Sequence, residues 1–210
     1  MKYFVDIVLV IFGYISGSFP PAYITVTLFK NKDIREIGSG NVGTTNVLRN
    51  VDLRLGIITG ILDVTKGFIP TYLAMRYSSI KWIPILVAVA SVVGHNWSIF
   101  LKLTGGKGVG TTIGSLLALS LNSNLNSNIN PMVFIPSIIG FILTLIFFKD
   151  FYIGAMVAYI IGPFSFLYFK RPFLEAILIL ILAIAVIYKI RFDLKRSFRK
   201  RRKATGDVRS

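Results

Sequence analysis

Several residue types that support common enzyme chemistries are scarce in this sequence. It has no cysteine and a single histidine. The first absence excludes disulfides and thiolate metal ligands, and the second argues against an ordinary zinc site. Acidic residues are also few, nine against 24 lysines and arginines, which leaves a formal net charge of +15. We therefore expect no metal, no cofactor, and partners that are anionic.

Apolar residues, in contrast, are present in excess. They make up 54% of the chain, and the mean hydropathy is +0.69, both well above the values of soluble proteins. The composition therefore predicts a membrane protein. In such a chain the positive charge points to anionic lipid headgroups and phosphorylated substrates rather than to nucleic acid, because no soluble domain is left to hold a duplex.

Seven apolar stretches are long enough, or nearly so, to cross a bilayer as helices of about 20 residues. Pro20 and Pro21 favour a bend in the first, which we expect to be retained as a span, because proline removes a backbone donor. The sequence predicts an all-α, polytopic membrane bundle of about seven helices over 1–190 and a basic tail over 191–210. The stretches lie near 3–29, 55–76, 81–101, 108–121 (the short one), 132–149, 151–169 and 172–190.

The basic residues are divided unequally between the connections. One side carries the loop from Lys30 to Arg54, the turn with Lys102 and Lys107, Lys149 and the tail, whereas the other carries Lys2, Arg76, Lys81, Lys170 and Arg171. The positive-inside rule then predicts an external N-terminus, with the loops and the tail in the cytoplasm. The uncharged stretch 121–130 is expected to be a flexible external connector. For the tail we expect contact with anionic lipid, and a role at the substrate is the alternative.

A glycine-rich stretch, GSGNVGTTN at 38–46, has the spacing of a dinucleotide-binding turn at Gly38, Gly40 and Gly43, with Asp63 twenty positions later. The context excludes that interpretation, because the preceding KNKDIREI is charged rather than a buried strand and Asp63 falls within an apolar span. What remains is the ability of glycine-rich backbone to bring amides together around an anion.

A second stretch of this kind, TGGKGVGTT at 104–112, repeats the string VGTT. It is not a phosphate-binding P-loop, because Gly108 follows the lysine where serine or threonine is required. Each stretch has a cation close by, Arg49 and Lys107, and both lie on the predicted cytoplasmic side. The pair predicts sites for one or two phosphorylated substrates, although glycines in membrane proteins also serve turns and close helix packing.

These strings, with GSFPPAYI in the first span, LDVTKGFIP in the second and GHNWSIFLKLTGGKGVGT after the third, resemble the bacterial acyl-phosphate:glycerol-3-phosphate acyltransferases of the inner membrane. The resemblance covers most of the chain. It implies transfer of a fatty acyl group from acyl phosphate to the 1-hydroxyl of glycerol 3-phosphate, forming lysophosphatidic acid in phospholipid biosynthesis. It also implies about seven spans with the polar motifs in the cytoplasm, and it makes no prediction of oligomeric state.

The resemblance assigns the site residues to three groups. The catalytic group is Lys107, Arg49 and Ser39, in which the two cations neutralise phosphate charge. The phosphate-binding group is Gly38, Gly40, Asn41, Gly43, Thr45, Asn46, Gly105, Gly106, Gly108 and Thr111. The supporting group is Asp63, Lys66, His95, Tyr188, Asp193 and Arg196.

Plainer roles remain open for several of these residues. The first motif can be a capped turn, and Lys107 an ordinary cytoplasmic lysine. Asp63 and Lys66, three apart on one helix face, can simply neutralise each other. His95 can be a hydrogen-bonded packing element instead of a general base. No Ser-His-Asp or Cys-His arrangement can be assembled, so we expect direct acyl transfer without an acyl-enzyme.

The chain also departs from the family pattern. In YKIRFDLKR at 188–196, Ile190 stands where the family has histidine and Asp193 where it has asparagine, and Ser98 replaces the usual proline of the second motif. These departures leave open a divergent paralogue that uses another acceptor or has lost turnover. A separate alternative is a membrane carrier for an organic anion, with the glycine loops as its cytoplasmic gate.

Overall fold

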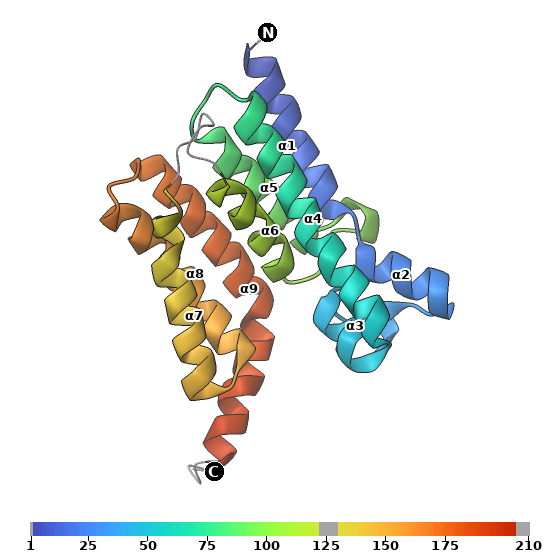
Figure 1. Ribbon diagram of the computed structural model, residues 1–210. Coiled ribbons are helices and arrows are strands. Elements are labelled where there is room, and N and C mark those ends of the chain that lie inside the picture. The colour runs from blue at the N-terminus through green and yellow to red at the C-terminus, as the bar shows by residue number, and fades with distance from the viewer. Residues whose placement is uncertain (1, 122–129, 205–210) are drawn as a thin grey trace. The chain divides into compact units, whose positions relative to one another are not determined.

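The computed structural model describes residues 2–121 and 130–204, which are helical throughout apart from turns and short connections (Figure 1). The all-α prediction is thereby confirmed. Contacts divide the chain into two compact units, Met1–Pro131 and Met132–Ser210. The predicted connector at 121–130 lies almost wholly outside the described residues, as do residues 205–210 of the predicted tail.

The first unit contains six of the α-helices that the described residues form. Within it α1, α4, α5 and α6 pack against one another, while α2 and α3 gather beside the first half of α4 (Figure 1). Short 3-10 turns, η1 (Ile34–Glu36) and η2 (Ile99–Leu101), lie in its loops. The helices are α1 (Lys2–Ser18), α2 (Pro21–Lys30), α3 (Thr44–Asn50), α4 (Leu53–Tyr77), α5 (Ile83–Asn96) and α6 (Val109–Ser120).

Glycines set how closely the helices of this unit approach. A Cβ atom added at Gly17 of α1 would lie 1.9 Å from the Ser91 carbonyl oxygen of α5. One added at Gly114 of α6 would lie 1.9 Å from the Val64 carbonyl oxygen of α4. Backbones packed this tightly exclude any larger residue, as is typical of helix pairs in membranes.

The bend predicted at the paired prolines is a complete break between two helices. α1 ends at Ser18 and α2 begins at Pro21, because neither Pro20 nor Pro21 has an N–H group to continue the α1 hydrogen-bond ladder. The break leaves the carbonyl oxygens of Ser18 and Phe19 available to other groups. Ser98 Oγ donates to the first at 2.5 Å, and Lys66 Nζ donates to the second at 2.8 Å.

The second unit is formed by α7 (Ile135–Phe148), α8 (Phe151–Tyr168) and α9 (Phe173–Ala204), which follow the turn η3 (Pro131–Phe134). α8 packs against both α7 and α9. Asp150 caps α8 by accepting hydrogen bonds from two backbone amides of its first turn. α9 continues well beyond the predicted end of the last span at 190, so the described part of the basic tail is helical.

Among the described residues, four segments are long and apolar enough to cross a membrane: Tyr3–Lys30, Pro131–Phe148, Phe151–Tyr168 and Phe173–Arg199. α5 and α6 are apolar but have only 14 and 12 residues, short of the roughly 20 of a full crossing. α4 has 25 residues but carries buried charges at its centre. The predicted stretches are therefore helical, while the count of seven crossings and the single-domain division stay predictions.

Candidate functional site

The short turn η1 comes directly before the first glycine loop and is fixed by the side chain of Asp33. Asp33 caps η1 by accepting from the Arg35 amide at 2.9 Å, and it also accepts hydrogen bonds from the Arg35 guanidinium. These hydrogen bonds lower the pKa of the Asp33 carboxyl. The same guanidinium lies 5.2 Å from the centre of the Tyr23 ring, which fastens the turn to α2.

The loop itself is folded around the side chain of Asn46. The Asn46 Nδ2 group donates to the carbonyl oxygens of Ile37 and Asn41 at 2.9 and 3.0 Å, while Oδ1 accepts from the Ser39 amide at 3.2 Å. The side-chain amide of Asn46 thus forms hydrogen bonds that hold the loop in its conformation. A contact between Asn46 and phosphate stays a prediction. Gly38 lies under this arrangement with φ +57°, a conformation that favours glycine.

Most amides of the loop are also engaged within it. Gly40 N bonds to Ile37, Gly43 N to Asn41, and Asn41 N to Ser39 Oγ at 3.4 Å. The groups that the loop presents outward are therefore side chains more than backbone amides. Ser39 and Arg49 are exposed, and Thr45 is half-buried.

The second glycine loop packs directly on the end of α5. The Gly106 amide donates to the His95 carbonyl oxygen at 3.1 Å. A Cβ atom at Gly106 would lie 2.0 Å from His95 Nε2 and 2.8 Å from the carbonyl oxygen of Val42. Gly105 also abuts the His95 carbonyl, and Gly108, with φ +78°, leads into α6. The two predicted glycine loops therefore meet, at Gly106 and Val42.

A buried ionic cluster lies beneath this meeting point. Asp63 Oδ1 is 3.1 Å from Lys66 Nζ and 3.4 Å from His95 Nδ1, and Asp63 Oδ2 accepts from Thr44 Oγ1 at 3.0 Å. Asp63, Lys66 and His95 are only 3%, 6% and 6% exposed. The predicted pairing of Asp63 with Lys66 is confirmed, and the structure adds His95 and Thr44 to it.

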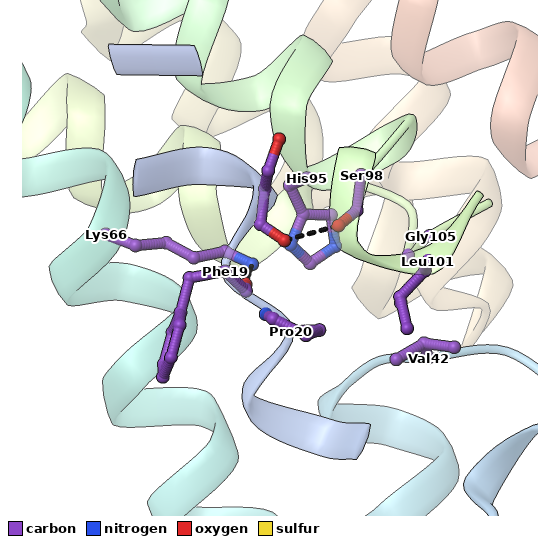
Figure 2. A pocket seen from close by; sticks show the side chains of 10 residues that line it. Phe19, Pro20, Val42, Lys66, His95, Ser98, Leu101 and Gly105 are labelled. Atoms are coloured by element: carbon purple, nitrogen blue, oxygen red, sulfur yellow. Dashed lines mark hydrogen bonds between the residues drawn. The ribbon is translucent and has the colours of Figure 1, made fainter. Parts of the chain in front are cut away.

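A small pocket opens beside the cluster, between the α1–α2 break and the second glycine loop (Figure 2). Lys66 and His95 reach into the same space, close to Phe19 and Pro20. Its enclosed space is about 10 Å³, roughly that of one water molecule, so it suits only a small polar group. It is lined by Ser18, Phe19, Pro20, Val42, Lys66, His95, Ser98, Leu101, Gly105 and Gly106.

The structure distributes the remaining predicted residues as follows. Lys107 is half-buried in the second loop, and Thr111 is buried on α6, with a hydroxyl that has no hydrogen-bond partner among the described residues. Tyr188, Asp193 and Arg196 lie on α9 in the second unit, where Arg191 stacks on the Tyr188 ring. Ile190, where the resemblance led us to expect a histidine, is completely buried.

Three groups of the site were not predicted from the sequence: the Thr44 hydroxyl, the Ser98 hydroxyl as a hydrogen-bond donor, and the Phe19 carbonyl oxygen. The paired prolines were a usable signal for the last, because they end the helix, and the final carbonyl groups of a helix have no partners within it. For Thr44 the sequence offered only its place directly after Gly43.

Comparison with known proteins gives the same relatives by sequence and by structure. The family model Glycerol-3-phosphate acyltransferase matches residues 7–200. Glycerol-3-phosphate acyltransferase 2 of Moorella thermoacetica is 34% identical over 184 residues, 88% of this chain and 89% of that protein. The enzyme of Endomicrobium trichonymphae is 35% identical over 192 residues, 91% and 92% of the two chains.

Two solved structures are similar over nearly the whole length. Both are crystal structures of PlsY (YgiH), an integral membrane glycerol 3-phosphate acyltransferase. Its glycerol 3-phosphate form has a TM-score of 0.80 and 29% identity, covering 94% of each chain. Its lysophosphatidic acid form has a TM-score of 0.75 and 28% identity, covering 94% of this chain and 93% of that one.

Proposed function

This chain belongs to the glycerol-3-phosphate acyltransferase family, and from that premise we infer that its substrates meet where the two glycine loops meet. It is an integral membrane acyltransferase that esterifies glycerol 3-phosphate to lysophosphatidic acid, as the motifs predicted. The observation that supports the location is the contact of Gly106 with Val42 above the buried cluster of Asp63, Lys66 and His95.

We propose acyl phosphate as the acyl donor. An acyl phosphate is already activated, so the protein needs to orient the reactants and stabilise developing charge rather than supply a nucleophile. The acceptor hydroxyl oxygen forms the ester bond to the acyl carbon while the bond from that carbon to the phosphate oxygen breaks. The hydroxyl proton ends on the orthophosphate that leaves, so the reaction balances without a cofactor.

Arg49, Ser39 and Lys107 are the residues that we propose to contact phosphate oxygens. Ser39 is exposed in the first loop, Arg49 is exposed in the last turn of α3, the helix that follows this loop, and Lys107 belongs to the second loop. In this proposal the two segments present cations to one site. Guanidinium and ammonium groups form strong, charge-assisted hydrogen bonds with phosphate. Because the amides of the first loop are largely used internally, these side chains carry most of the anion binding in this proposal.

We also propose that this site faces the cytoplasm from the bacterial inner membrane. The proposal rests on the unequal division of Lys and Arg between the connections. Large apolar side chains are exposed on helices of both units, as expected where membrane lipids cover them.

The buried Ile190 favours one alternative, a paralogue with a different acceptor. A fully buried isoleucine offers no polar group to an acceptor, whereas the family histidine does. Comparing glycerol 3-phosphate with other small phosphorylated alcohols as acceptors separates this alternative from the proposal. A carrier for an organic anion, in contrast, requires a sealed membrane and consumes no acyl phosphate.

The deciding experiment follows orthophosphate and lysophosphatidic acid from purified protein in detergent, given acyl phosphate with and without glycerol 3-phosphate. We expect both products only when the acceptor is present. Arg49→Ala and Lys107→Ala should reduce the rate at least 100-fold, since each removes charge stabilisation at the phosphate. Arg54→Ala and Lys102→Ala are matched controls, because both are exposed cations outside the proposed contacts. Wild-type rates in the first pair would refute the assignment.

A further inference from the structure

Asp63 lies where three separate parts of the site come together. Its Oδ2 atom accepts from the hydroxyl of Thr44, the residue that begins α3 directly after the first glycine loop. Its Oδ1 atom faces Lys66 of its own helix and His95 of α5. The carboxylate is almost fully buried, and in a medium of low dielectric such contacts are stronger than they are in water.

Each residue that contacts Asp63 also contacts, or belongs next to, a different part of the site. Thr44 connects it to the first loop. His95 connects it to the second, since its carbonyl oxygen binds the Gly106 amide and its ring lies against Gly106. Lys66 connects it to the α1–α2 break by donating to the Phe19 carbonyl oxygen at 2.8 Å. One carboxylate thus links both glycine loops and the break.

Neutralisation of Lys66 alone does not explain this arrangement. An ion pair between residues three apart on α4 requires neither a hydroxyl from α3 nor a ring from α5. Both are nevertheless directed at the same carboxylate, from helices that carry the two loops. The contacts that go beyond the ion pair therefore join α4 to the two helices next to the loops.

We propose that Asp63 is a positioning residue that sets the distance between the two glycine loops, and hence between the two reacting substrates. The inference rests on the proposed function, because the effect on turnover presupposes acyl transfer between the loops. Displacements of about 1 Å at a reacting centre can cost roughly 100-fold in rate. A residue of this kind affects kcat far more than KM, since each loop keeps its own substrate contacts.

The first test removes both charges of the ion pair at once. Asp63→Leu alone would strand a buried ammonium group, whereas Asp63→Leu with Lys66→Met replaces the pair by apolar residues, which is often tolerated. We expect the double variant to keep a cooperative thermal transition by circular dichroism in detergent, with kcat lowered about 10- to 100-fold and KM values within about threefold. A folded double variant with kcat within twofold of wild type would show that Asp63 only neutralises Lys66.

The second test uses Thr44 and remains decisive if the double variant does not fold. Thr44→Val removes the hydroxyl at almost constant volume and should lower kcat about tenfold, while Thr44→Ser, which keeps the hydroxyl, should restore it. Thr59→Val is the matched control, because Thr59 is a buried threonine of α4 whose hydroxyl bonds to Thr25 instead, at 3.1 Å. Equal kcat for Thr44→Val and Thr44→Ser would overturn the proposal.

A third measurement is independent of turnover and so separates this inference from the proposed function. The chain has no cysteine, so spin labels can be attached to Glu36→Cys and Lys102→Cys, both exposed positions beside the two loops. The distance distribution between the labels should broaden or shift in Thr44→Val and not in Thr59→Val. An unchanged distribution would refute the positioning role even in a fully active enzyme, and an inactive wild type would refute only the proposed function.

Discussion

Substitution of Gly106 by alanine isolates the contact between the two glycine loops. The added Cβ atom would lie 2.0 Å from His95 Nε2, against about 3.4 Å for an ordinary contact. The His95 ring cannot easily turn away, because it is buried against Asp63, and the Val42 carbonyl oxygen stands 2.8 Å away on a rigid backbone. The loop must therefore shift by about 1 Å or more. We expect destabilisation of about 1–3 kcal/mol and a fall in kcat of roughly 100-fold.

The assay is orthophosphate release with both substrates saturating, together with a thermal transition in detergent for each variant. Gly162→Ala of α8 is the control. Its added Cβ would lie 3.3 Å from its nearest atom, Ile179 Cγ2, so a side-chain methyl group needs to move by only a few tenths of an ångström. The control should keep a cooperative thermal transition at unchanged kcat. A folded Gly106→Ala protein with kcat within twofold of wild type would show that the loops tolerate separation, and the steric reasoning would be wrong.

Two further predictions concern the first loop and the topology. Asn46→Ala should destabilise the protein by about 2 kcal/mol, because it leaves two loop carbonyls and the Ser39 amide without their hydrogen-bond partner. Thermal unfolding in detergent measures the loss. An unchanged transition temperature would show that other contacts hold the loop in shape. In sealed vesicles, an impermeant maleimide should label Arg49→Cys and Lys102→Cys from one side and Arg76→Cys from the other. Labelling of the first two from opposite sides would exclude a shared phosphate site.

Apolar composition and proline placement were sufficient for much of the fold. The stretch at 3–29 breaks at Phe19 and Pro20, where its prolines predicted a bend, since a missing N–H group is a local property of the sequence. Helix ends were predicted less well. α5 stops at Asn96 where a span to 101 was predicted, because the turn that follows is fixed by the bond between the Ser98 amide and the Thr104 carbonyl. That bond depends on a backbone path that periodicity does not reveal.

For the site, the motifs predicted the family and placed both glycine loops on one side of the membrane, but they did not predict that the loops touch or how their atoms are used. The sequence suggested that amides of the first loop converge on an anion. In the structure the amides of Ser39, Gly40, Asn41 and Gly43 bond to nearby carbonyls or side chains, and anion binding by this loop stays a prediction. Pairing of Asp63 with Lys66 followed from helical spacing. The addition of Thr44 and His95 did not, because residues 19 and 32 positions away share a carboxylate only through tertiary packing.

The break between α1 and α2 has an electrostatic consequence for a protein so poor in acidic residues. Aligned peptide units give the carboxyl end of a helix a partial negative charge of about half an elementary unit. Lys66 places its ammonium group at such an end, that of α1, by way of the Phe19 carbonyl. The main chain thus supplies part of the negative charge that balances the buried ammonium group of Lys66. The break in the helix makes this pocket polar without a second carboxylate.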